Sequence, residues 1–216
     1  YSGTDGKVEW SIDANGHLLL TGDGDYSGSA DWREYAYQIK TATVKVKNMT
    51  NASGMFSYCT NLKRIDFSEF DTSQITNMGA MFNGCESLVS LDLNNFKTQN
   101  VTEMYSMFAN CSNLYKVDIS SFDTSKVTDM SGMFSYCPKI KRLDLSSFNT
   151  SNVRYMAGMF FGCENLVSLE VNHFDTKKSE SFTSTFGDCG CLKELDLSNW
   201  DFSSATYTSD MFTRAS

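Results

Sequence analysis

Apolar residues recur along this chain with a fixed period of 26 residues. Columns of cysteine, aromatic and leucine residues keep the same place in each repeat. They are Cys59, Cys85, Cys111, Cys137, Cys163 and Cys189; Phe56, Phe82, Phe108, Phe134, Phe160, Phe186 and Phe212; Phe70, Phe96, Phe122, Phe148, Phe174 and Trp200; and Leu62, Leu88, Leu114, Ile140, Leu166 and Leu192. A fixed period of this length is typical of a solenoid, in which each repeat buries its apolar face only against its neighbours.

Two different patterns alternate within one repeat. In "KRLDLSSF", residues 141–148, Leu143 and Leu145 alternate with polar residues, which predicts a short strand. In "DTSKVTDMSGMFSYC", residues 123–137, the apolar residues lie at i, i+3, i+6, i+7 and i+10. This spacing predicts a helical segment, and residues 123–125 offer candidates for its N-cap.

One strand and one helical segment per repeat predict an α/β repeat solenoid of the leucine-rich-repeat kind. It would have a parallel sheet on one face and short helical segments on the other. A parallel β-helix, a fold that many enzymes use, is the competing interpretation. Its coils would be strands all round, and the helical spacing favours the first interpretation.

The first 40 residues do not follow the repeat. Residues 7–22, "KVEWSIDANGHLLLTG", alternate apolar and polar positions around Asn15-Gly16, which is typical of a β-hairpin. We expect residues 1–40 to form an N-terminal β-hairpin cap that covers the end of the solenoid. Residues 41–216 would then form about six coils of 26 residues.

Composition narrows the class of partner. The chain has 216 residues, one proline and a net charge of −8, so it is acidic and has no proline-rich linker. The negative charge argues against nucleic acid and anionic membrane surfaces as partners. No apolar run approaches the ~18 residues of a membrane helix, so this segment is not expected to insert into a membrane. The start, "YSGTDGKVEW", lacks the pattern of a signal peptide, and we expect Tyr1 to follow a cut made either after a signal peptide or inside a longer protein.

The repeat resembles a known family. The recurring "F-D-T-S-x-V-T-x-M-x-x-M-F-x-x-C-x-x-L-x-x-L-D-L-S-x-F" is similar to that of the BspA-like leucine-rich-repeat surface proteins of bacteria, and residues 8–39 resemble the cap of that family. The resemblance implies a secreted or cell-anchored protein of a host-associated bacterium. It implies adhesion to host matrix proteins or to other cells, through a protein or glycan partner. It supplies no catalytic motif.

An acidic column is the clearest polar feature of the predicted strands. Each member lies between two inward apolar residues, so all six should line one exposed sheet face. The column is Asp66, Asp92, Asp118, Asp144, Glu170 and Asp196. Carboxylates on strands ~4.8 Å apart repel one another unless cations offset them. Arg64, Lys116 and Arg142 lie two residues earlier on the same face and would do part of this.

The column has a structural and a functional interpretation. It can be a solvated consensus, or an acidic surface that recognises a basic partner or Ca²⁺. Specificity would lie in the variable exposed positions next to it, among them Tyr115. These positions are Lys63, Val89, Tyr115, Lys141, Val167 and Lys193. A glycosidase-like carboxylate pair is disfavoured, because nothing in the sequence desolvates one pair.

A second candidate is a calcium-binding loop in the cap. In "DGDYSGSADWRE", residues 23–34, the polar residues match the spacing of a calcium loop. The candidate ligands are Asp23, Asp25, Ser27, Asp31 and Glu34. The preceding "HLLL" is strand-like where an entering helix is needed, which argues against a calcium site. Ca²⁺ binding is therefore kept only as an alternative, and no other cofactor is expected.

The cysteine column is expected to be a buried ladder of free thiols. Equivalent coils give no cysteine a preferred disulfide partner, and ligands in a line do not make a tetrahedral metal site. Cys191 lies outside the column and should be exposed. The sequence thus predicts a non-enzymatic surface binding module that uses the sheet face. A structural spacer and a calcium-dependent module remain the alternatives.

Overall fold

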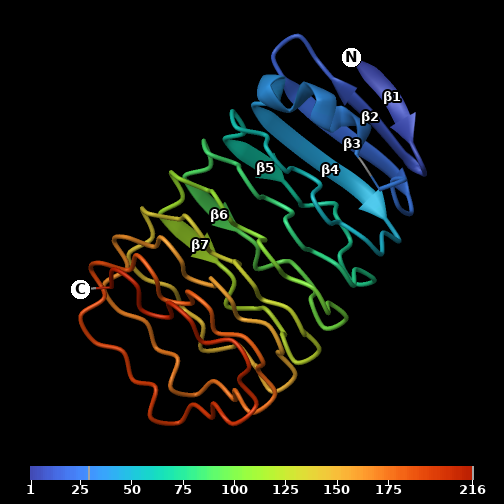
Figure 1. The fold of residues 1–216 in the computed structure, drawn as a ribbon. Coiled ribbons are helices and arrows are strands. Elements are labelled where there is room, and N and C mark those ends of the chain that lie inside the picture. Colours follow the sequence, from blue (N-terminus) through green and yellow to red (C-terminus); the bar gives the residue numbers. More distant parts are fainter. Residues whose placement is uncertain (29, 216) are drawn as a thin grey trace.

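The computed structural model describes residues 1–28 and 30–215 (Figure 1). The chain winds into an elongated stack of coils, with the N-terminal strands at one end and the last repeats at the other (Figure 1). The predicted solenoid is confirmed.

The cap contains the predicted hairpin and two further elements. Strands β1 (Ser2–Asp5), β2 (Val8–Ile12) and β3 (His17–Asp23) pair antiparallel in that order, and a 3-10 helix, η1, covers Asp31–Gln38. The β2–β3 turn is closed by the Asp13 carboxylate, which accepts the backbone N–H groups of Asn15 and His17. Gly16 takes a φ of 81° there, a value that glycine adopts without strain.

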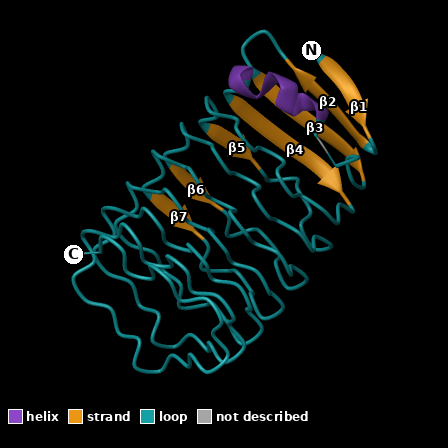
Figure 2. Cartoon of the chain, in the orientation of Figure 1, coloured by secondary structure: helices purple, strands orange, loops and turns teal. Residues whose placement is uncertain are grey.

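A parallel sheet joins the cap to the coils. Strand β3 pairs in parallel with β4 (Thr41–Lys47), from His17 opposite Thr41 to Asp23 opposite Lys47, and β4 pairs with β5 (Arg64–Asp66). Strand β6 (Ser90–Asp92) pairs in parallel with β7 (Lys116–Asp118). A single parallel bridge, Arg142 to Ser168, continues this side of the stack. The strands lie along one side, and turns make up the rest of each coil (Figure 2).

The predicted helical segments are wrong. In the coils, the described residues of "TDMSGMFSYC" and its copies form successive turns. Their N–H groups alternate between two acceptors: Met81 donates to Met78 within its own coil, and Phe82 donates to Met107 of the next coil. A second parallel ladder of single bridges accompanies these bonds at Asn51, Asn77, Glu103, Asp129, Tyr155, Ser181 and Tyr207.

Residues with positive φ explain why no helix forms. Two positions in each repeat have φ between 51° and 75°, four residues apart. They are Gly54, Ala80, Ser106, Gly132, Gly158, Ser184 and Asp210, and Tyr58, Gly84, Asn110, Tyr136, Gly162, Asp188 and Arg214. A left-handed residue cannot continue a right-handed α-helix, so the backbone turns at these positions. Alternate N–H groups then donate to carbonyls of the neighbouring coil.

The predicted apolar columns form the core. The rings of Phe56, Phe82, Phe108, Phe134, Phe160, Phe186 and Phe212 stack with centroids 5.3 to 6.0 Å apart. All of them are fully buried except Phe212, which is 48% exposed. The buried threonine column adds polar links between coils. The Thr124 hydroxyl donates to the carbonyl of Asn149 and accepts the N–H of Asn149, one coil later.

Candidate binding face

The sheet face is the outward side of the short strands and of the equivalent segments in later coils. Its outward side chains follow each buried leucine of the Leu62 column, and those of Lys63, Arg64 and Asp66 are exposed in the first coil. The inward neighbours, such as Leu91 and Leu93, are buried. The strand period of two therefore separates the core from a face that solvent can reach.

The aspartates of the acidic column form a tight turn at the end of each strand segment. The carboxylate of Asp144 accepts the backbone N–H and the hydroxyl of Ser146, two residues later. The same backbone bond recurs at Asp66, Asp92, Asp118 and Asp196. Such turns are a common use of aspartate, and they explain why the residue recurs.

These hydrogen bonds favour the ionised carboxylates. They hold the pKa of Asp66, Asp118, Asp144 and Asp196 below the usual range. Glu170 shares the column position and is exposed. The sheet face thus carries a row of acidic side chains, and hydrogen bonds favour the charged form of Asp66, Asp118, Asp144 and Asp196.

The predicted cations lie beside this column without pairing to it. Among the described residues, Arg64, Lys116 and Arg142 form no ion pair; the pairs found are Lys45–Glu69, Lys97–Asp71, Arg154–Glu180 and Arg214–Asp188. The nearby charge of Lys116 makes a small contribution to the low pKa of Asp118, after the hydrogen bonds from Asn94 and Ser120. Of the three cations, Lys116 therefore shows the expected offsetting of the column's negative charge, and its effect on Asp118 is weak.

A hollow opens beside Tyr115. Its volume is about 420 Å³, and it is lined by Tyr115, Lys139, Lys141 and Asn165. The ammonium of Lys139 donates to the side-chain oxygen of Asn113 at 2.5 Å. The amide nitrogen of Asn165 donates to the carbonyl of Pro138 at 2.7 Å. The sequence singled out Tyr115 and Lys141 but missed Lys139 and Asn165.

A longer period in the sequence could have pointed to the Lys141-Arg142 pair beside this hollow. The stretch "SYCTNLKRIDFSEF", residues 57–70, is closer to "SYCPKIKRLDLSSF", residues 135–148, than to the coil that follows it. Likewise "NGCESLVSLDLNNF", residues 83–96, returns as "FGCENLVSLEVNHF", residues 161–174. The exposed segments of the first and second coils therefore recur in the fourth and fifth, so Lys63-Arg64 and Lys141-Arg142 are equivalent pairs, whereas Tyr115-Lys116 of the third coil correspond to Lys193-Glu194.

The structure gives the candidate calcium ligands separate partners. Asp23 accepts a hydrogen bond from the Asn48 amide, and Asp25 accepts the N–H and hydroxyl of Thr50. The hydroxyl of Ser27 donates to Asp5, as does the backbone N–H of Asp31 at 3.0 Å.

Asp5, which the sequence did not indicate, is thus the residue that holds this loop. Burial raises the pKa of Asp5, but the hydrogen bonds that it accepts outweigh burial and lower the pKa overall. Within the described ranges, no three His, Cys, Asp or Glu side chains are grouped so that they could hold a metal ion. Glu34 is exposed. Ca²⁺ binding at this loop stays a prediction.

The cysteine column is buried and free, and Cys191 is free and exposed, as predicted. Each column thiol after the first donates to a phenylalanine carbonyl of the preceding coil, as Cys137 does to Phe108 at 3.0 Å. The equivalent bonds come from Cys85, Cys111, Cys163 and Cys189. The sequence indicated a small apolar residue here and missed this hydrogen bond.

One family model matches most of the chain. It is described as "Mycoplasma protein of unknown function, DUF285", and it matches residues 31–142 and 111–216. The chain belongs to the DUF285 family. The matched residues begin at η1 and include every coil, so the columns described above are part of the DUF285 region.

Solved structures similar to this DUF285 chain are bacterial leucine-rich-repeat proteins, the class that the sequence resemblance indicated. One from Eubacterium ventriosum is 17% identical, with 96% of this chain and 73% of that chain covered and a TM-score of 0.30. One from T. pallidum is 16% identical, with 87% and 88% covered and a TM-score of 0.37. A leucine-rich cell surface protein from Faecalibacterium prausnitzii is 14% identical, with 91% and 82% covered and a TM-score of 0.29.

No curated protein matches this chain. In the described ranges, no helix has the length and apolar character needed to cross a membrane.

Proposed function

We propose that this DUF285 chain is a non-enzymatic binding module that holds a partner on its sheet face. The observation that carries the proposal is the contrast between constant and variable columns within one chain. The buried positions repeat almost unchanged, whereas Val89, Tyr115 and Lys141 occupy the same exposed place in three successive coils. Packing does not select these side chains, so they are free to serve recognition.

The charge state of the sheet face supports binding over catalysis. A general acid needs a carboxyl group whose pKa is raised, commonly by burial. The column carboxylates Asp66, Asp118, Asp144 and Asp196 have the opposite shift, caused by the hydrogen bonds that they accept. They suit recognition by charge and hydrogen bonding.

The module would act at a bacterial cell surface or in secreted form, in adhesion to host matrix proteins, glycans or other cells. The resemblance of the repeat to BspA-like surface proteins supports this setting. A spacer that only presents another domain is the alternative if the face binds nothing.

The test is binding of the chain to a panel of matrix proteins and glycans, with and without Ca²⁺. The test variant carries Asp92→Asn, Asp118→Asn and Asp144→Asn. The control carries Asp123→Asn, Asp175→Asn and Asp201→Asn, which form the same type of turn beyond the sheet face. We expect a partner that the test variant loses and the control keeps. Binding that neither variant changes would remove the acidic column from the proposal, and a partner bound only with Ca²⁺ would support the calcium-dependent module.

A further inference from the structure

A cationic cluster lies at the start of the strand segments in the third and fourth coils. It consists of Lys116, Lys139, Lys141 and Arg142, all exposed. In the part of the chain that the structure describes, none of the four forms an ion pair. Four adjacent cations without a direct carboxylate partner are unusual in a chain of net charge −8, because no ion pair within the described ranges holds any of them.

Two members of the cluster, Lys139 and Lys141, line a hollow beside an aromatic ring. Tyr115 is 55% exposed, and it forms one wall of the 420 Å³ hollow that Lys139, Lys141 and Asn165 complete. The bond from Lys139 to Asn113 holds its ammonium in place and leaves two further N–H donors. An exposed ring offers a flat apolar surface, so the hollow combines an apolar wall with fixed cations.

The acidic column borders the cluster two residues further along each strand. A ligand seated on Lys116 and Arg142 therefore also meets the carboxylates of Asp118 and Asp144. A densely charged polyanion would be repelled there. A ligand with widely spaced anionic groups and many hydroxyls would not, because the carboxylates accept hydrogen bonds from hydroxyls.

We propose that the hollow beside Tyr115 binds an acidic glycan, a sugar chain with carboxylate or sulfate groups. The anionic groups contact the lysines and Arg142, a sugar ring packs on Tyr115, and hydroxyls donate to the acidic column. This deepens the proposed function, on which it rests, by naming the class of ligand. A protein partner fits less well, because lysine and aspartate are depleted from the centres of protein interfaces.

The three-coil period supports an extended ligand. The equivalent pair Lys63-Arg64 lies three coils before Lys141-Arg142, or roughly 14 Å away at a coil spacing of ~4.8 Å. It too forms no ion pair among the described residues. A chain of sugars that follows the sheet face can reach both pairs, and two weak contacts on one polymer reinforce each other.

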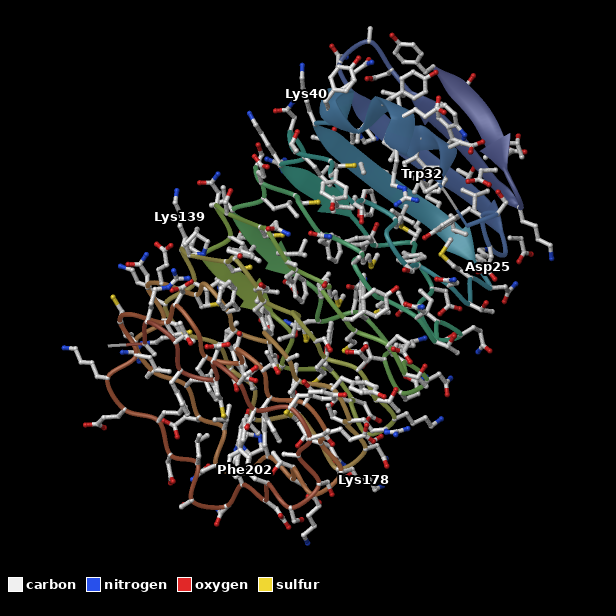
Figure 3. The ribbon with its side chains drawn as sticks, viewed as in Figure 1. Asp25, Trp32, Lys40, Lys139, Lys178 and Phe202 are labelled. Carbon is white, nitrogen blue, oxygen red and sulfur yellow. The ribbon has the colours of Figure 1, made fainter. Side chains whose placement is uncertain are left out.

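The experiment measures binding of the full chain to labelled oligosaccharides of three kinds: chondroitin sulfate with sulfates, hyaluronan with carboxylates alone, and neutral dextran. We expect binding to at least one anionic glycan, weakening as salt rises, and none to dextran. The test variant is Lys139→Gln with Lys141→Gln. Its matched control is Lys177→Gln with Lys178→Gln, because Lys178 donates to Asn152 as Lys139 does to Asn113. Lys139 and Lys178 lie on opposite edges of the stack (Figure 3).

The test variant should lose at least tenfold in affinity, and the control less than twofold. Tyr115→Phe should keep the affinity and Tyr115→Ala should lose at least fivefold, as expected for packing of a sugar on the ring. Equal losses in both lysine variants, no binding of either anionic glycan, or tighter binding of polyglutamate or an oligonucleotide would overturn the proposal. If glycans fail while the panel still yields a partner lost with the acidic column, only the ligand class is wrong.

Discussion

The column cysteines make hydrogen bonds that a purely apolar residue could not. Each thiol from Cys85 onward donates to a carbonyl of the preceding coil. Burial raises the pKa of Cys59 and Cys111 to about 12 and that of Cys189 to about 11. Because the thiolate is the reactive form, the ladder should be chemically inert in the folded chain.

Alkylation tests this directly. In the native chain at pH 8, iodoacetamide should modify Cys191 and leave the six column thiols intact, because Cys191 alone among the seven is exposed. Unfolding in urea should make all seven reactive. The measurement is mass spectrometry of peptides after timed quenching, with Cys191→Ser as the control that should show no early label. Early modification of Cys137 or Cys163 would mean that the coils open on the labelling timescale.

At the scale of one coil, strained turns take the place of a helix. Ala80 has a φ of 53°, which costs an L-residue about 1–2 kcal/mol. Glycine avoids this strain, although it loses more entropy on folding, by about 0.5–1 kcal/mol. The equivalent residues in two later coils, Gly132 and Gly158, are glycine.

Ala80→Gly should therefore raise the free energy of unfolding by about 0.5–1 kcal/mol, against the usual direction of this substitution. Ala157→Gly is the control, because Ala157 lies in the same kind of turn without a positive φ. It should lower the free energy of unfolding by about 0.5–1 kcal/mol. Urea denaturation measures both, and destabilisation by Ala80→Gly would contradict the assigned turn.

The period of the sequence was enough to predict the coils, their core and the exposed side of the strands. It was not enough for the turn side. Successive turns closed by i to i−3 bonds, such as Met81 to Met78, bring apolar residues inward at spacings of three and four, as a helix does. Glycine stands at one or both of the left-handed positions in several coils, as at Gly132, Gly158 and Gly162, and these glycines were the evidence against a helix.

The sequence was enough to predict which face of the solenoid is exposed, but not the side-chain contacts that form the candidate site on it. The strand period indicated an outward acidic column, and Tyr115, which was picked out as a variable position, is exposed beside it. It could not show that Asp144 is engaged by Ser146, or that Lys139 and Asn165 complete a hollow with Tyr115. Those contacts depend on how three coils are offset from one another, which no single repeat encodes.

At the scale of the whole molecule, each coil is supported by its two neighbours. A residue inside the stack therefore loses more when truncated than its equivalent at the end. Phe134 lies between two stacked rings and is fully buried, whereas Phe212 stacks only on Phe186.

Phe134→Ala should lower the free energy of unfolding by about 3–5 kcal/mol, as cavity-forming changes do. Phe212→Ala should cost about 1 kcal/mol, because half of that ring already lies in water. Chemical denaturation of both variants, read by circular dichroism, gives the comparison. Similar losses at the two positions would mean that the last coil is as well supported as the middle of the stack.

The backbone bonds on the turn side tie each coil to both of its neighbours. Gly54 donates to Gly79 and Ala80 to Tyr105 of the next coil, whereas Thr102 donates to Thr76 of the preceding coil. On the cap side, Trp32 Nε1 and the Tyr26 hydroxyl donate to the carbonyls of Met55 and Ser53, so acceptors of the first coil are already used. The cap therefore occupies bonding groups of the first coil that would otherwise be open to another stack, as natural proteins do with exposed sheet edges.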